Sequence, residues 1–118
     1  MAYRTPSFAN NWVVYASLKH AQKSRLFAGQ KQLISSLNRS LKSIASPRTS
    51  FGRQLRLLQA LRKKPQSTQA LCRTLNVSRR TLFRDLATIR SAGIDIESDG
   101  QNFELSPKQL RSALGQAL

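Results

Sequence analysis

The fold is decided by residues 75–96, LNVSRRTLFRDLATIRSAGIDI. Asn76 tolerates the left-handed backbone conformation that ends a helix, and Ser78 is a good N-cap for the helix that follows. Apolar residues then recur at helical spacing, namely Leu82, Leu86 and Ile89. Gly93 ends the pattern. The stretch therefore predicts a tight turn followed by a helix over about 79–92.

Two shorter helices are expected before this turn. The first covers about 52–63 and ends before Pro65, which cannot continue a helix. Its apolar residues are Leu55, Leu57, Leu58 and Leu61. The second covers about 68–75 and is capped by Ser67 or Thr68. Its inward residues are Leu71, Cys72 and Leu75.

A β-hairpin is expected after the long helix. Apolar and acidic residues alternate over 94–97, and apolar and polar residues alternate over 102–105, on either side of a Ser98-Asp99-Gly100 turn. Ser106 and Pro107 then open a C-terminal helix over 106–118. Its leucines are spaced four apart at Leu110, Leu114 and Leu118.

The predicted fold is mainly α with a small β-hairpin: a winged helix-turn-helix over 51–105, with additional N-terminal helices and the C-terminal helix. Residues 1–50 are a basic arm or a helical extension. One helix opens near Ser7, with Phe8, Trp12, Tyr15 and Ala16 on one face. A second helix covers about 30–44, with an apolar stripe of Leu33, Ile34, Leu37, Leu41 and Ile44. Residues 45–50 form a linker.

Charge is distributed very unevenly along the chain. The formal net charge is +15, and 17 of the 20 Lys and Arg residues lie in residues 1–84, which contain no Asp or Glu. Residues 85–118 hold three basic and five acidic residues. Such a long stretch without acids favours a polyanionic partner, nucleic acid before an anionic membrane.

The outward face of the helix after Ser78 is the predicted reading surface. A recognition helix enters the major groove with its N-terminal residues near base edges, where arginine can bond both acceptors of guanine. Arg73 on the preceding helix and Gln101 or Asn102 at the tip of the hairpin are further candidates. The predicted DNA-binding residues are Ser78, Arg79, Arg80, Thr81, Phe83, Arg84, Arg73 and Gln101.

Residues 53–105 resemble a known family. The stretch RQLRLLQALRKKPQSTQALCRTLNVSRRTLFRDLATIRSAGIDIESDGQNFEL is similar to the DeoR-type winged helix-turn-helix, which is shared with regulators that carry a WYL domain. The resemblance implies a bacterial or phage transcription regulator, usually a repressor. It also implies that the outward residues from Ser78 to Arg84 face DNA. Phe83 stands where such domains often have Tyr, whose hydroxyl can reach a phosphate, and phenylalanine cannot make that bond.

Two features depart from the resembling regulators. They carry a large C-terminal effector domain, which this sequence does not show, so no small-molecule ligand is expected. The hairpin is also acidic, with Asp95, Glu97, Asp99 and Glu104. Carboxylates repel phosphates, so only the tip of the wing, at Gln101 or Asn102, is expected to approach DNA, or none of it.

Few other residues are candidates for a metal site or for catalysis. His20 is the only histidine and has no clustered partners, so it is expected on the surface, and no metal, cofactor or catalytic residue is predicted. Cys72 is the only cysteine and is expected in the core. Asp85 is expected to be structural, pairing with neighbours of Arg84 or with Arg73.

The sequence leaves several alternatives open. With one cysteine, no signal-peptide core and no run of about 18 apolar residues, a cytoplasmic, nucleoid-associated protein is expected. A sequence-specific regulator is weighed against an architectural or packaging DNA-binding protein and against an adaptor for a nucleic-acid machine. Residues 1–50 are a DNA-wrapping arm, a dimerisation element or a segment that orders on DNA. A homodimer through the N-terminal or C-terminal helices is expected, because such readers often pair two half-sites.

Overall fold

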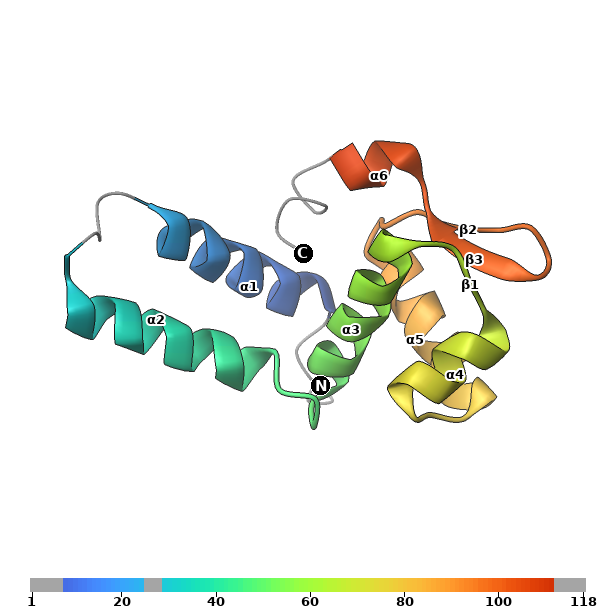
Figure 1. Ribbon diagram of the computed structural model, residues 1–118, viewed down its shortest axis with the longest axis horizontal. Helices are drawn as coiled ribbons and strands as arrows, with labels where there is room; N and C mark the ends of the chain where they lie inside the picture. Colours follow the sequence, from blue (N-terminus) through green and yellow to red (C-terminus); the bar gives the residue numbers. More distant parts are fainter. Residues whose placement is uncertain (1–7, 25–28, 112–118) are drawn as a thin grey trace, which may run out of the picture.

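The computed structural model describes residues 8–24 and 29–111. Figure 1 shows the order of its helices and strands. The elements are α1 (Phe8–Lys23), α2 (Lys31–Ile44), α3 (Ser50–Lys63), β1 (Gln66–Ser67), α4 (Thr68–Leu75), α5 (Arg79–Ser91), β2 (Ile96–Ser98), β3 (Asn102–Leu105) and α6 (Pro107–Arg111). The predicted leucines Leu114 and Leu118 lie outside the described residues.

Helices α3, α4 and α5 enclose the main apolar core. Six of their apolar side chains are fully buried: Leu57, Leu58, Leu71, Leu82, Leu86 and Ile89. The predicted helix over 68–75 is confirmed without change. The other two predictions differ at their ends, since α3 begins at Ser50 and α5 ends at Ser91. Burial of a leucine-sized side chain contributes about 1.5–3 kcal/mol, so this cluster holds the three helices together.

Three side-chain caps set the starts of these helices. Thr49 Oγ1 accepts the Gly52 N–H at 2.9 Å. Ser67, and not Thr68, caps α4 by accepting the Ala70 N–H at 3.1 Å. The cap predicted at Ser78 and the left-handed residue predicted at Asn76, with φ of 54°, are both present. The turn between α4 and α5 is therefore fixed locally by its own residues.

The wing is a three-stranded antiparallel sheet in the order β1-β3-β2. The predicted hairpin forms β2 and β3, with Ile96 opposite Leu105. Strand β1 was not predicted from the sequence. It consists of Gln66 and Ser67 alone, which is too short for an alternating pattern, and it forms because it meets the edge of β3.

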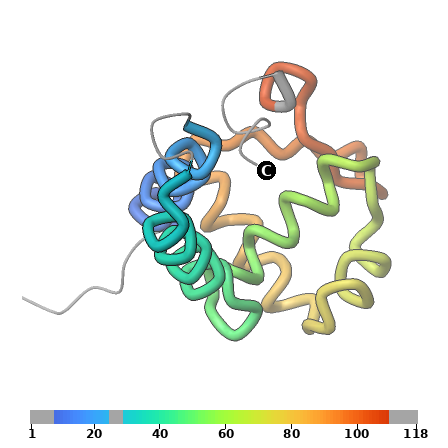
Figure 2. Tube along the Cα trace, turned by 60° about the vertical axis from the view of Figure 1, so that its left-hand side comes forward, coloured from blue at the N-terminus to red at the C-terminus, as the bar shows by residue number. Residues whose placement is uncertain are grey.

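Helices α1 and α2 lie side by side as a hairpin next to α3 (Figures 1 and 2). The two N-terminal helices predicted from the sequence are confirmed. Rings from α1 pack on Phe51 at the start of α3: the Phe8 and Tyr15 centroids lie 5.4 Å and 5.8 Å from that of Phe51. Trp12 lies 5.8 Å from Tyr15 and extends the cluster. This aromatic contact joins the N-terminal hairpin to the helix-turn-helix.

Gly52 permits the close passage of the linker over α3. A Cβ atom built on Gly52 would lie 1.8 Å from the Ser46 carbonyl oxygen. The same carbonyl accepts the Thr49 hydroxyl at 2.8 Å. Only a residue without a side chain fits at position 52, so the linker is pinned against the first turn of α3.

Candidate nucleic-acid interface

Helix α5 has one buried side and one exposed side. Leu82, Leu86 and Ile89 are fully buried against α3 and α4. Ser78, Arg79, Arg80 and Arg84 are exposed, and Thr81 is half-buried. The predicted separation of inward and outward residues on this helix is therefore confirmed. The exposed side places three guanidinium groups along the N-terminal half of the helix, two of them in its first turn.

Ser78 and Thr81 form a pair at the start of α5. Ser78 Oγ accepts the Thr81 N–H at 3.2 Å and its hydroxyl donates to Thr81 Oγ1 at 3.2 Å. Both hydrogen bonds engage the Ser78 side chain within the protein. The Thr81 hydroxyl proton is then the one that this pair can offer to an external acceptor.

Phe83 connects α5 to the wing. Its side chain is 43% exposed, and its ring meets the Phe103 ring of β3 edge-on, with centroids 6.1 Å apart. The Arg79 guanidinium carbon lies 5.8 Å from the Phe83 centroid, a cation–π contact. The aromatic ring thus supports the wing on one side and Arg79 on the other.

Arg90 also holds the wing to α5, a role that the sequence pattern did not predict. Its Nε and Nη2 donate to the Ile96 carbonyl oxygen at 3.2 Å and 2.9 Å. Its guanidinium carbon lies 5.9 Å from the Phe103 centroid. The acceptor is a backbone carbonyl, so no residue type in the sequence pointed to the contact.

Asp85 pairs with α3, and the prediction that it pairs with Arg73 or neighbours of Arg84 is wrong. Its Oδ2 lies 2.6 Å from Arg53 Nε, and its Oδ1 lies 2.9 Å from Arg53 Nη2. Gln54 Nε2 donates to Oδ1 at 3.1 Å. Asp85 is three residues after Leu82 and so shares its buried face, which turns the carboxylate away from the exposed arginines.

The ion pair with Asp85 also affects the pKa of the Arg53 guanidinium. Hydrogen bonding to Asp85 raises the pKa of the guanidinium, and partial burial opposes the rise. Asp85 is 1% exposed, and both of its carboxylate oxygens have partners. The Arg53 side chain is therefore engaged by Asp85 within the protein.

The wing tip is organised by Asp99. Its Oδ1 accepts the backbone N–H groups of Gln101 at 2.9 Å and Asn102 at 2.7 Å. These bonds, the one from Asn102 first, lower the pKa of the Asp99 carboxyl. Gln101 is exposed and Asn102 is half-buried. The tip is therefore a closed turn that presents the Gln101 side chain to solvent.

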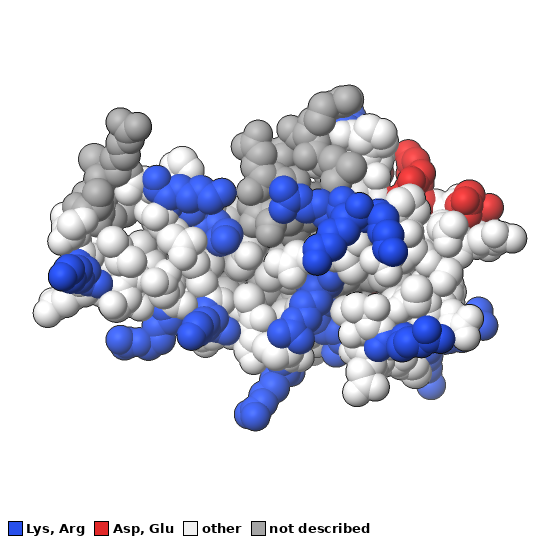
Figure 3. Space-filling view, in the orientation of Figure 1, with Lys and Arg blue, Asp and Glu red and all other residues white. Residues whose placement is uncertain are grey.

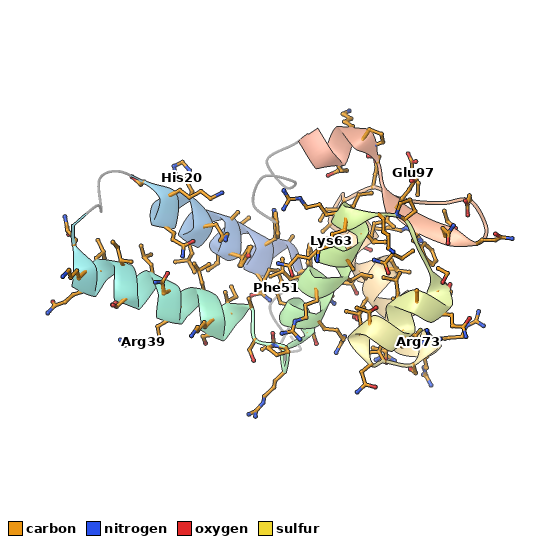
Figure 4. All side chains as sticks on the ribbon, in the orientation of Figure 1. His20, Arg39, Phe51, Lys63, Arg73 and Glu97 are labelled. Carbon is orange, nitrogen blue, oxygen red and sulfur yellow. The ribbon has the colours of Figure 1, made fainter. Side chains whose placement is uncertain are left out.

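The other wing carboxylates are also exposed. Glu97 of β2 stands directly opposite Glu104 of β3. Figure 3 shows the acidic side chains of that face gathered at the wing end of the molecule, while Lys and Arg spread over the rest. Figure 4 labels Glu97 there.

Contacts join some of the predicted site residues and not others. Ser78 contacts Thr81, and Arg79 contacts Phe83. Within the described part of the chain, the side chains of Arg80 and Arg84 make no hydrogen bond or ion pair. Arg73 is exposed on α4 (Figure 4), and Gln101 is exposed on the wing.

Residues 53–102 match the model of a protein family described as HTH domain. This part of the chain is a helix-turn-helix domain of the DNA-binding type found in DeoR- and WYL-like regulators. The expected winged helix-turn-helix is confirmed. Comparisons with curated proteins and with solved structures gave no match.

Other kinds of site find little support in the described residues. Within 8–24 and 29–111, no three His, Cys, Asp or Glu side chains come together as metal ligands would. His20 is exposed on α1 (Figure 4), and Cys72 is half-buried against the core. None of the helices in these ranges combines the length and apolar character needed to cross a membrane.

Proposed function

We propose that this chain is a sequence-specific transcriptional regulator, acting as a repressor, that reads the major groove of DNA with α5. The observation that carries the proposal is the N-terminal half of α5. There Arg80 and Arg84 are exposed and have no intramolecular partner among the described residues, while the opposite side of the helix is buried. An unpaired arginine at a helix N-terminus can reach guanine without breaking an existing bond.

We assign different tasks to the residues of this surface. Arg80 is the base reader, and Arg79, held over Phe83, reads a neighbouring base or its phosphate. Arg84 and Arg73 contact phosphates, as does the Thr81 hydroxyl, while Ser78 orders the turn. Gln101 contacts the backbone from the wing tip. The exposed carboxylates keep the rest of the wing away from DNA.

A second function is favoured by one observation. The 17 basic residues in residues 1–84 would also suit an architectural protein that coats DNA with little sequence preference. Such a protein shows a steep dependence of affinity on salt for every duplex. A regulator of the proposed kind adds discrimination of a factor of about 10³ or more between its site and other DNA.

Selection of bound duplexes from a random pool, at moderate salt, tests the proposal. We expect an enriched motif, and a footprint with two half-sites about one helical turn apart if two copies bind together. Arg80→Ala should weaken binding by about 1–3 kcal/mol and relax one position of the motif. Arg39→Ala, an exposed arginine on α2 (Figure 4), is the matched control and should leave the motif unchanged. Absence of any enriched motif would leave the architectural function in its place.

A further inference from the structure

A groove runs between the N-terminal hairpin and α3. It has a volume of about 560 Å³ and receives side chains from α1, α2 and α3. Tyr15 and Leu41, both buried, contribute its apolar lining. Gln22 and Asn38 line it as well, with Gln22 Nε2 donating to Asn38 Oδ1 at 2.7 Å.

Three cationic side chains converge on this groove, one from each helix. They are Lys19 of α1, Lys42 of α2 and Arg56 of α3. Among the described residues no carboxylate lines the groove, and the partners of the Arg53–Asp85 ion pair are not part of its lining. The three charges repel one another without a counter-ion, and an anion in the groove would relieve that repulsion.

Helix stability does not account for the arrangement. Lys42 lies in the last turn of α2, where a cation favours the helix dipole. Lys19 lies before the last turn of α1, and Arg56 lies in the middle of α3, so neither gains in this way. Their meeting with Lys42 in one groove depends on how the three helices pack.

We propose that this groove binds backbone phosphates of DNA flanking the segment read by α5. The inference rests on the proposed function and extends it to the N-terminal helices. The N-terminal hairpin lies at one end of the longest axis of the molecule and α4 and the wing lie at the other (Figure 1), and this axis extends 48 Å. That length corresponds to roughly 14 base pairs at 3.4 Å per base pair.

The test compares two duplexes and two double variants of the full chain. One duplex holds only the selected motif, and the other adds about 14 base pairs on each side. Lys19→Gln with Lys42→Gln removes two charges from the groove. Lys23→Gln with Lys31→Gln is the matched control, because it also removes one lysine from each helix and neither residue lines the groove. Thermal unfolding checks that both variants are folded.

We expect the wild type to bind the longer duplex more tightly, and the groove variant to lose that gain while it keeps the motif. Loss of two phosphate contacts should reduce the change in affinity between 50 and 200 mM salt by on the order of tenfold. The control should keep the gain. Equal losses in both variants, or no gain from flanking DNA in the wild type, would overturn the proposal. Failure of the proposed function would appear differently, as the lack of a selected motif with the dependence on duplex length intact.

Discussion

Arg53 on α3 and Asp85 on α5 form a two-point ion pair, with Nε 2.6 Å from Oδ2 and Nη2 2.9 Å from Oδ1. Gln54 donates a third bond to the same carboxylate. These bonds tie the buried side of α5 to α3, directly behind the exposed arginines. The direction in which the proposed reading surface faces therefore depends on a buried carboxylate that does not itself contact DNA.

Removing this carboxylate should destabilise the domain. Asp85→Ala leaves Arg53 and Gln54 without their partner; loss of one member of a fully buried pair costs about 3–5 kcal/mol, and the cost here should be smaller because the Arg53 side chain is 27% exposed and can be solvated. Urea unfolding followed by circular dichroism measures the change. The double variant Arg53→Met with Asp85→Leu should recover part of the loss, since apolar residues of similar volume can replace a buried pair, while the buried Gln54 amide still lacks its acceptor. If the double variant is no more stable than Asp85→Ala, the destabilisation of Asp85→Ala does not come from the unpaired charge of Arg53.

Asp85 also illustrates which features the sequence could predict. Apolar spacing at Leu82, Leu86 and Ile89, and caps such as Ser78, are local signals, so the helices and the turn were predicted closely. The partner of Asp85 lies 32 residues away in the chain, and its choice depends on how α3 crosses α5. Strand β1 and the bond from Arg90 to the Ile96 carbonyl likewise require the folded wing.

Gly52→Ala should destabilise the protein although alanine is the better helix former. The added Cβ would lie 1.8 Å from the Ser46 carbonyl oxygen, so the linker or α3 must shift. Overpacking of this kind costs about 1–3 kcal/mol. Thermal unfolding of Gly52→Ala and of Arg62→Ala, an exposed position on the same helix, gives the comparison. A Gly52→Ala protein as stable as the wild type would show that the linker does not press on α3.

Glu97→Lys should stabilise the wing. Glu97 stands directly opposite Glu104, and like charges in that position are unfavourable. A lysine converts the pair to opposite charges, with an expected gain of about 0.2–1 kcal/mol that weakens as salt is added. Hydrogen exchange of the β3 amides reports the gain. Asp95→Lys changes the charge equally but lies outside the strand pairing, and should not give the same protection.

Phe83→Ala and Phe83→Tyr should separate packing from DNA contact. Alanine removes the edge contact with Phe103 and the support of Arg79, and should cost on the order of 1 kcal/mol of stability. Tyrosine keeps the ring, and the family resemblance implies that its hydroxyl reaches a phosphate. We therefore expect Phe83→Tyr to unfold like the wild type and to bind DNA more tightly. A Tyr variant as unstable as the Ala variant would contradict the packing argument.

Acid should loosen the wing tip through Asp99. Its carboxylate accepts the N–H groups of Asn102 and Gln101, which lowers its pKa in the folded protein. A depressed folded pKa means that the stabilisation is complete above the unfolded value of about 3.9 and is lost as pH falls through the folded value. The Asn102 amide resonance should therefore shift below about pH 4 in the wild type. Asp99→Asn should remove that shift, whereas Asp95→Asn should leave it in place, and an unchanged titration in Asp99→Asn would assign the transition to another group.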